Sequence, residues 1–262
     1  MNILLAALFA ANSKRRRVGG VQSWTATIAR EFRRIGHDVT LWCPEYAPPA
    51  GPFDFGIIAN WTRTGHAAPV CKHTINVCHG IIPAEQPKGG AVTVFTSEGV
   101  KRHWGGSGPI IRQPIDLDFW TPGRGPGGLV RFSYYGGLEW LEDVAAELRV
   151  DYHHIKTATP DVALQAMRGA LCVLATGRAS LEAMACGAPV VILDDRPYQG
   201  PLLSYSPQNQ MTQNYSGRCG ATPTPETVRD AIDDAIANGN LRPHVERFHD
   251  SKRIAGELLG LY

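Results

Sequence analysis

The segment from Arg178 to Leu193, RASLEAMACGAPVVIL, constrains the fold more than any other part of the chain. It predicts a helix that leads directly into a buried strand. Ser180 is a favourable helix N-cap, the residues after it are strong helix formers, and Gly187 is a typical residue at which a helix ends. Val190–Leu193 is an unbroken aliphatic run, as expected for a parallel strand covered on both faces. The segment therefore indicates an α/β protein with a parallel sheet.

The composition is that of a globular protein with room for two domains. The chain has 262 residues, of which 44% are hydrophobic and 19% charged. Its formal net charge of +2 does not require a polyanionic partner. The six cysteines form no CxxC pair, and most lie in apolar runs. This favours free thiols in a reducing compartment over a disulfide scaffold.

The N-terminal run MNILLAALFAA is apolar, but its basic residues follow it instead of preceding it. We therefore interpret it as a first buried strand and not as a signal peptide. No segment elsewhere reaches the length of about 20 apolar residues that a membrane-spanning helix needs. We expect a cytoplasmic location, and attachment to a membrane surface stays open.

Strand and helix patterns alternate in both halves of the chain, which predicts parallel, doubly wound sheets. In the first half, strands are expected at Asn2–Phe9, Val39–Cys43, Phe55–Ala59, Thr74–Cys78 and Val92–Thr96, with a helix from Val21 to Ile35. In the second half, strands are expected at Leu129–Tyr135, Tyr152–Ile155, Leu171–Ala175 and Val190–Leu193. The helices expected there are Leu138–Leu148, Pro160–Arg168, the segment after Ser180, Thr224–Ala237 with Thr224 as N-cap, and Ser251–Leu259.

Glycine and proline gather around residues 105–128, which marks an interdomain linker. We predict an N-terminal Rossmann-like domain at residues 1–115 on the acceptor side, a linker at 116–128, and a C-terminal nucleotide-binding domain at 129–250. The terminal helix at 251–262 is expected to pack back on the N-terminal domain.

Several motifs, in their order along the chain, resemble segments of the GT-B glycosyltransferases, in particular the large retaining group called family 4. They are Val18–Val21, Gly36–Val39, Phe95–Glu98, Pro114–Pro122, and Ser180–Gly187 followed by Pro189–Val191. The resemblance implies two Rossmann-like domains facing a central cleft. It implies a hexosyl or other glycosyltransferase that moves a sugar from a nucleotide diphosphate sugar to a hydroxyl group, with retention. It also implies that no metal and no cofactor besides this co-substrate is needed.

The same resemblance assigns a donor site to the start of the helix around Ser180. Glu182 is expected at an accessible position in the first helical turn, where its carboxylate accepts hydrogen bonds from the ribose hydroxyls. The amides of Gly177, Arg178 and Ala179 are expected to hold a phosphate. From its position directly before the predicted helix, we expect the Arg178 guanidinium to reach the same group, as a substitute for basic residues that the family usually has elsewhere.

Further candidates lie where predicted strands end, because open α/β sheets bind ligands at the carboxyl edge. Gly19 and Gly20 are predicted to let a diphosphate or acceptor approach the backbone and to leave amides free for an anion. Gly136 follows the first strand of the second domain and is a candidate donor-binding residue. His79 ends a strand, and the resemblance implies that it contacts the donor sugar or the acceptor. For Glu98 and Asp116 we expect a cap role and a turn role.

One feature indicates what kind of acceptor the enzyme uses. It is the basic run Lys14, Arg15, Arg16 and Arg17. It adjoins Gly19 and Gly20, so we expect an anionic acceptor surface there. The segment Lys101–Trp104 extends this surface in our interpretation, with Trp104 as a stacking or membrane-interface residue. A hydroxylated base in phage-type DNA, a cell-envelope glycan and a lipid headgroup all fit as acceptors. The sequence does not indicate an oligomeric state.

Two departures from the family pattern keep other functions open. The loop Tyr134–Glu142 carries acids where the family usually has an Arg and a Lys, and Leu174 stands where the family has its first Glu. The alternatives are a nucleotide-sugar epimerase on the same fold and a non-catalytic nucleotide-sugar-binding protein. The adjacent His153 and His154 point to opposite faces if they lie on a strand, so they do not suggest a zinc site.

Overall fold

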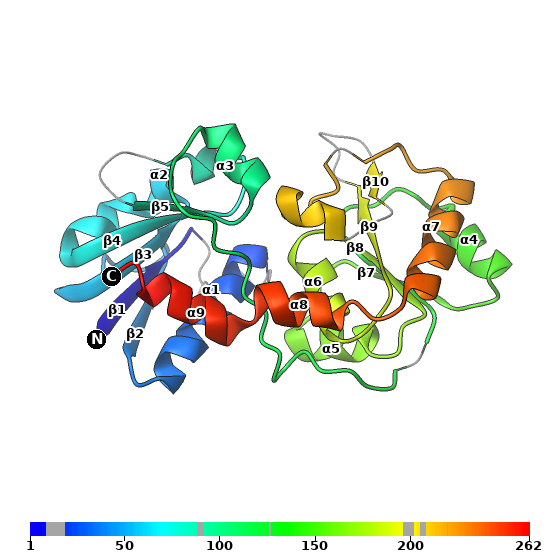
Figure 1. The fold of residues 1–262 in the computed structure, drawn as a ribbon, viewed down its shortest axis with the longest axis horizontal. Helices are drawn as coiled ribbons and strands as arrows, with labels where there is room; N and C mark the ends of the chain where they lie inside the picture. Colours follow the sequence, from blue (N-terminus) through cyan, green and yellow to red (C-terminus); the bar gives the residue numbers. More distant parts are fainter. Residues whose placement is uncertain (9–18, 88–91, 126, 196–201, 205–207, 219) are drawn as a thin grey trace. The chain divides into compact units, whose positions relative to one another are not determined.

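The computed structural model describes residues 1–8, 19–87, 92–125, 127–195, 202–204, 208–218 and 220–262. The chain forms two compact units (Figure 1). Unit 1 comprises Met1–Asp116 and His249–Tyr262, and unit 2 comprises Leu117–Phe248. Each unit is a mainly parallel sheet with helices, which confirms the predicted α/β fold class.

The sheet of unit 1 has the strand order β2-β1-β3-β4-β5, and all of its strands are parallel. The strands are β1 (Asn2–Ala6), β2 (Asp38–Trp42), β3 (Phe53–Ala59), β4 (Cys71–Cys78) and β5 (Val92–Phe95). Ile3 of β1 lies opposite Val39 on one side and Phe55 on the other. The direction in which strands are added therefore reverses at β1. The carboxyl ends of β1 and β3 flank this switch point, where sheets of this kind bind ligands.

Helices cover both faces of this sheet. They are α1 (Gly20–Arg34), α2 (Trp61–Thr64), η1 (Gly65–Val70), η2 (Pro83–Glu85), α3 (Glu98–Trp104) and α9 (Ser251–Leu259). α1 and α9 pack side by side and share a core with alternate residues of β1, β3 and β4. The buried Ser251 hydroxyl donates to Glu31 of α1 at 2.8 Å, so a hydrogen bond also ties α9 to α1. On the other face, η1 packs on β3 and β4.

The sheet of unit 2 has the order β10-β9-β8-β6-β7. Its strands are β6 (Leu129–Phe132), β7 (Tyr152–Ile155), β8 (Cys172–Ala175), β9 (Val190–Asp194) and β10 (Leu202–Ser204). Only β10 runs antiparallel among the described strands. The reversal of strand order occurs at β6, so the carboxyl ends of β6 and β8 flank the switch point of this unit.

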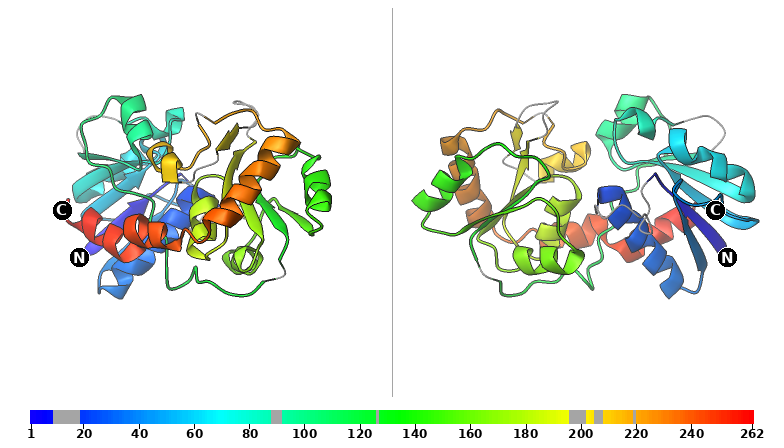
Figure 2. Two further views of the ribbon diagram at one scale, coloured as in Figure 1. Left: turned by 45° about the vertical axis from the view of Figure 1, so that its right-hand side comes forward. Right: turned by 180° about the vertical axis from the view of Figure 1, so that it is seen from behind.

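The helices of unit 2 are α4 (Leu141–Glu147), α5 (Pro160–Met167), α6 (Arg178–Ala185), η3 (Gln208–Gln213), α7 (Pro225–Asn238) and α8 (Arg242–His249), whose last residue already belongs to unit 1. α4 and α7 share a core with Cys172 and Leu174 of β8. α6 packs on β8 and β9 and is contacted by α5. Figure 2 shows α5 and α6 on one face of the sheet and α4 and α7 on the other. Both faces are thus covered, which explains the unbroken apolar runs of the inner strands.

Several predicted boundaries differ from the structure. The predicted strand Leu129–Tyr135 ends at Phe132, and the helix predicted from Leu138 begins at Leu141. The physical reason is the turn between them, in which Leu138 has a φ of 63° and cannot belong to a helix. α7 begins after Thr224, whose hydroxyl accepts from the Thr227 amide at 3.2 Å, so the predicted N-cap is confirmed.

Candidate functional site

α6 begins closer to β8 than the sequence suggested. Its N-cap is Gly177, with φ 61° and ψ −130°, and Arg178 is its first residue. The prediction that Ser180 caps this helix is therefore wrong. The backbone of Gly177 adopts a conformation that residues with a Cβ rarely adopt, and this allows the chain to turn into the helix within two residues of the strand. Ser180 lies in the first turn and is fully buried.

Arg178 and Glu182 form a buried ion pair one helical turn apart. The Nε of Arg178 donates to Oε1 of Glu182 at 2.7 Å, and each residue is only 9% exposed. Burial raises the pKa of Glu182, and the charge and hydrogen bond of Arg178 oppose this shift. The expectation of an accessible Glu182 in the first turn is wrong, because it lies in the second turn and is covered. Arg178 presents its charge to Glu182 in this structure.

The amides at the start of α6 are only partly available for a ligand. The Gly177 amide donates to the carbonyl oxygen of Tyr215 at 2.5 Å, so its predicted role as a phosphate ligand is not supported. The amides of Ala179 and Ser180 belong to the first turn, where no acceptor exists inside the helix. Among the described residues, the Ser180 Oγ is one of the few buried side-chain atoms without a hydrogen-bond partner. The start of α6 thus holds a buried hydroxyl whose hydrogen-bonding capacity is unused.

A glycine loop lies at the end of β6, the strand next to β8. Gly136 is exposed and a Cβ there would meet open space, whereas Gly137 has a φ of 83°. Tyr134 and Tyr135 are also exposed, and their rings pack edge to face with 5.6 Å between centroids. The structure thus places Gly136 and the start of α6 at neighbouring strand ends in unit 2.

This loop is anchored by residues that the sequence analysis missed. Arg131 of β6 pairs with Asp195 and donates to the Gly137 carbonyl oxygen at 2.6 Å. The Ser133 hydroxyl contacts both oxygens of Asp195, at 2.6 and 2.7 Å. The available signal was an arginine within the apolar strand LVRF and an acidic pair directly after the aliphatic run at Val190.

In unit 1, His79 follows β4 at the carboxyl edge, as its sequence position indicated. It is 8% exposed, and its ring lies edge-on to Trp24 of α1, with 5.0 Å between the ring centroids. Its amide donates to Oε2 of Glu85 at 2.9 Å. The structure therefore brings His79 next to the helix that begins at Gly20.

Gly19 and Gly20 are exposed at the start of α1, and Gly20 has open space where a Cβ would lie. The Gly19 amide donates to the Gln22 side chain at 2.7 Å, so the prediction that this amide is free is wrong. The N-cap has an ordinary extended conformation, φ −104° and ψ 171°. Open space, and not an unusual backbone angle, is what glycine provides here.

The basic run Lys14, Arg15, Arg16 and Arg17 lies outside the described residues. In α3, Arg102 and His103 are exposed, and Trp104 donates through Nε1 to the Gly80 carbonyl oxygen at 2.9 Å. This hydrogen bond places α3 beside the residue that follows His79.

The two further acids take part in ion pairs. Glu98 pairs with Arg112, which lowers its pKa, while Ser97 caps α3. The buried Asp116 pairs with Arg30 at 2.5 Å.

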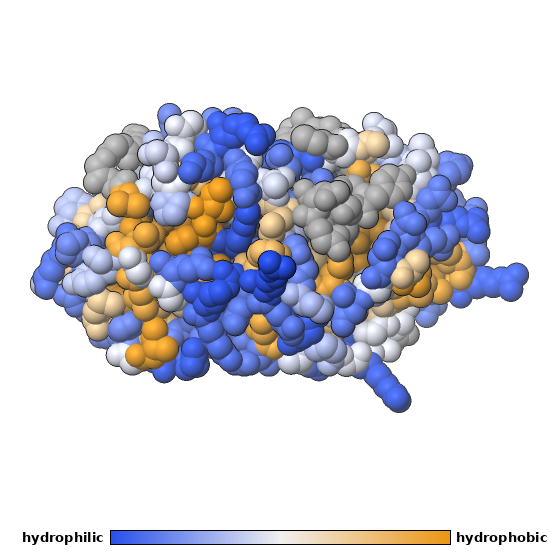
Figure 3. Space-filling model, in the orientation of Figure 1, coloured by the Kyte–Doolittle hydropathy of each residue, from blue (hydrophilic) through white to orange (hydrophobic). Residues whose placement is uncertain are grey.

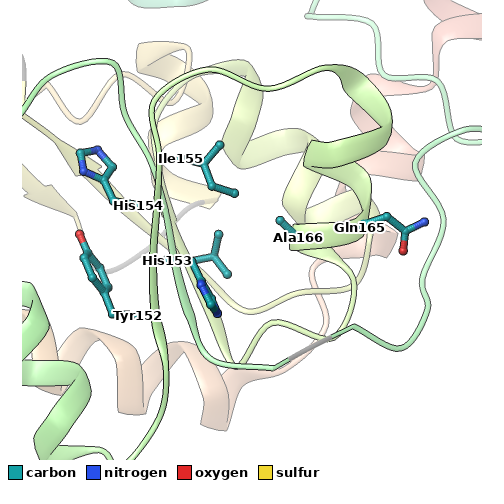
Figure 4. A pocket seen from close by; sticks show the side chains of 7 residues that line it. Tyr152, His153, His154, Ile155, Gln165 and Ala166 are labelled. Atoms are coloured by element: carbon teal, nitrogen blue, oxygen red, sulfur yellow. The ribbon is translucent and has the colours of Figure 1, made fainter.

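A pocket of about 500 Å³ lies elsewhere in unit 2, between β7 and α5 (Figure 4). His153 and Ile155 lie on one side of β7, and Tyr152 and His154 on the other, as expected for a strand. The predicted donor residues do not line this pocket.

No group of three or more His, Cys, Asp or Glu residues that could hold a metal ion occurs in the described part of the chain. The helices described there are all too short or too polar to cross a membrane. On the face shown in Figure 3, hydrophobic residues form separate patches among hydrophilic ones.

No protein-family model matches this sequence, and no curated protein matches it significantly. Solved structures do match over nearly the whole chain. AviGT4, described as a glycosyltransferase involved in avilamycin A biosynthesis, has a TM-score of 0.68 at 15% identity and covers 99% of this chain and 96% of its own. Sucrose-phosphate synthase from Thermosynechococcus elongatus has a TM-score of 0.64 at 13% identity, with 99% and 98% covered. An alpha-glucosyltransferase, solved with UDP and a 13-mer DNA containing an HMU base, has a TM-score of 0.57 at 11% identity, again with 99% and 98% covered.

The chain therefore has a GT-B glycosyltransferase-like fold. This fold agrees with the fold class that the sequence motifs indicated. At these identities the likeness concerns the fold, and the activity has to be argued from the residues of this chain.

Proposed function

We propose that this protein is a glycosyltransferase that takes a sugar from a nucleotide diphosphate sugar. The observation that carries the proposal is the start of α6. A buried carboxylate, a buried arginine and a buried hydroxyl without a partner gather at the N-terminus of a helix, at the carboxyl edge of a parallel sheet. Helix N-termini favour phosphate groups, and a carboxylate can accept from a ribose diol.

In the proposed donor site, unit 2 binds the nucleotide. Glu182 accepts from the ribose hydroxyls through the oxygen that does not pair with Arg178. The amides of Arg178, Ala179 and Ser180 lie towards the diphosphate, and Arg178 turns from Glu182 to the diphosphate or bridges the two. Gly136 leaves space for the sugar or the diphosphate at the neighbouring strand end.

In the proposed reaction, the acceptor hydroxyl oxygen bonds to the anomeric carbon while the bond from that carbon to the diphosphate oxygen breaks. The hydroxyl proton passes to the leaving diphosphate on the same face, so the configuration is retained. No protein nucleophile is needed for this step. His79 contacts the donor sugar or the acceptor from unit 1, and Gly19 and Gly20 leave space for the diphosphate or the acceptor.

We propose an anionic acceptor that meets Lys14–Arg17 and the exposed side of α3. A hydroxylated DNA base, a lipid headgroup and a cell-envelope glycan are the classes to test. The DNA in the alpha-glucosyltransferase structure supports including the first of them. A cytoplasmic protein, peripheral to the membrane if the acceptor is a lipid, fits this proposal.

The test begins with a thermal-shift screen of UDP-, GDP- and ADP-sugars, since a ligand that binds the native state raises Tm. A donor that binds is then incubated with DNA carrying hydroxylated bases, with anionic lipid vesicles and with neutral saccharides. Nucleoside diphosphate release together with sugar on the acceptor supports transfer. An isomerised sugar nucleotide would instead identify an epimerase.

Binding without any turnover would favour the non-catalytic alternative. The absence of a base in the loop after β6 is the observation that favours it. The anomeric configuration of the product, read by NMR, decides between retention and inversion.

A further inference from the structure

Glu85 is a buried carboxyl group in unit 1 that the proposed mechanism does not yet use. It ends η2, a short helix after β4, and is 3% exposed. Its Oε2 accepts from the amide of His79 at 2.9 Å, and its Oε1 accepts from the Nδ2 of Asn60 at 2.7 Å. An N–H group donates in both hydrogen bonds, so both carboxyl oxygens of Glu85 must act as acceptors.

Asn60 extends this contact to a third strand. It follows β3 directly and adopts a left-handed conformation, φ 56° and ψ 49°. Its Oδ1 accepts from the amide of Leu8, just after β1, at 3.1 Å. A single carboxyl group is therefore connected to the carboxyl ends of β1, β3 and β4. The first two of these ends flank the switch point of the sheet.

Opposing effects determine the pKa of Glu85. Burial raises its pKa to about 7, and the hydrogen bonds from His79 and Asn60 oppose the shift. Cys78, whose thiol donates to the Glu85 carbonyl oxygen at 3.1 Å, keeps its proton because burial and the Glu85 charge raise its pKa to about 12. α2 packs against η2 and carries one charged side chain, the exposed Arg63. Within the part of the chain that the structure describes, the titratable groups that face Glu85 are thus Cys78 and the neighbouring His79.

We propose that Glu85 is a positioning residue for glycosyl transfer, whose carboxylate holds the ends of β1, β3 and β4 in the arrangement that the reaction needs. This inference rests on the proposed function. When the carboxyl group takes up a proton, one of its oxygens becomes an O–H donor and faces the N–H of His79 or Asn60. One contact then weakens, and His79 or the end of β1 is no longer held.

Glu85→Gln is the informative variant because it keeps the shape and removes the ionisation. In this variant an NH₂ group replaces one of the two carboxylate oxygens, so it faces the N–H donor of His79 or of Asn60. Asn60 cannot correct this by turning its amide, because its oxygen accepts from Leu8. Glu257→Gln on α9 is the matched control, since Glu257 is partly exposed and pairs with Arg253 of its own helix.

The first measurement is an NMR titration of the wild type from pH 5 to 9. The amide resonances of His79 and Leu8 are expected to shift together with a midpoint near 7, the value for Glu85. This common step should be absent in Glu85→Gln and unchanged in Glu257→Gln. A step that persists in Glu85→Gln does not arise from Glu85. Two amides without a common step in the wild type would overturn the proposal, even if Glu85→Gln does not fold.

The second measurement is the rate of sugar transfer over the same range. A requirement for ionised Glu85 predicts a rise of about tenfold between pH 6 and 8 in the wild type. Glu85→Gln should lose this rise and transfer at least about tenfold more slowly at pH 8, since small displacements of reacting groups are costly. The same pH profile in wild type and Glu85→Gln would overturn the positioning role and leave the proposed function standing. No transfer by the wild type at any pH would overturn the proposed function and, with it, this role.

Discussion

Arg131 and Asp195 form a buried ion pair that connects β6 to the residue after β9, across the end of the intervening β8. Their side chains are 3% and 8% exposed. Because Arg131 also donates to Gly137 and Asp195 accepts from Ser133, the pair holds the glycine loop beside the start of α6. The sequence of residues 134–142 has no lysine or arginine, and the loop is held instead by a buried arginine from the strand before it.

Replacing Arg131 by Met should therefore destabilise the protein. The change leaves the Asp195 carboxylate buried without its partner, and losses of this kind cost about 3–5 kcal/mol. The free energy of unfolding is measured by urea denaturation. Arg229→Met breaks the exposed pair with Glu147 and should cost no more than about 1 kcal/mol. Equal costs for the two variants would contradict the structural role of the pair.

Glu182→Gln should weaken the binding of nucleosides and nucleoside diphosphates alike. If Glu182 holds the ribose, loss of its charge removes a charge-assisted hydrogen bond worth about 1.5–3 kcal/mol. The burial of Glu182 predicts a loss of stability as well, because Arg178 is left without a carboxylate. Calorimetry is therefore done at a temperature at which circular dichroism shows the variant to be folded. Unchanged affinity in the folded variant would reject the ribose role.

Arg178→Ala should weaken nucleoside diphosphate binding more than nucleoside binding, since only the diphosphate offers it an anion. Its effect should not add to that of Glu182→Ala, because the two side chains contact each other. Contacting residues commonly show coupling energies of about 0.5–3 kcal/mol in a double-mutant cycle. Additive losses, or equal losses for nucleoside and diphosphate, would mean that Arg178 acts on packing alone.

Unit 1 should lose stability as the pH rises through 7 because of Glu85. Its folded-state pKa of about 7 lies above the ordinary value of 4.5. The protonated form is thus favoured by folding, and its contribution is complete below about pH 4.5 and lost as the pH rises through 7. The linkage amounts to about 3 kcal/mol at most. Urea denaturation at pH 5, 6, 7 and 8 gives the free energies of unfolding of the wild type and Glu85→Gln, and the change in their difference with pH measures this linkage. A difference that does not change with pH would argue against a buried carboxyl group that ionises near 7.

Neutralising Lys14, Arg15, Arg16 and Arg17 to Gln should raise KM for an anionic acceptor and leave donor binding intact. For a DNA acceptor, the slope of log affinity against log salt should decrease by up to about 0.9 for each phosphate that the variant no longer neutralises. For an anionic vesicle, binding should weaken by about 1 kcal/mol per basic residue. Arg102→Gln tests whether α3 contributes to the same surface. Normal activity of the fourfold variant at low salt would direct the search to neutral saccharides.

The sequence was sufficient to predict the two α/β units, because apolar runs and turn residues mark most strands. The predictions that were wrong concern residues just after strands. Leu138 looks like the start of a helix until the turn before it forces a positive φ, and Ser180 looks like an N-cap until Gly177 takes that position. The partners of Arg178, Arg131 and Glu85 were not predictable for a related reason. Arg131 and Glu85 contact residues that the tertiary fold brings together, which no local pattern encodes. The pairing of Arg178 with Glu182 depends on a helix that begins at Arg178, whereas the local pattern placed the helix start at Ser180.

Unit 1 is completed only by the C-terminal segment His249–Tyr262, which is synthesised last. The core under α1 includes Ile254 and Leu258 of α9, which follow the whole of unit 2 in the sequence. During translation, the first half of unit 1 leaves the ribosome with this part of its core exposed, while unit 2 is continuous and can form from neighbouring residues. Nascent chains arrested before residue 249 should therefore present an apolar α1 face to chaperones, and it is the emergence of the last helix that removes it.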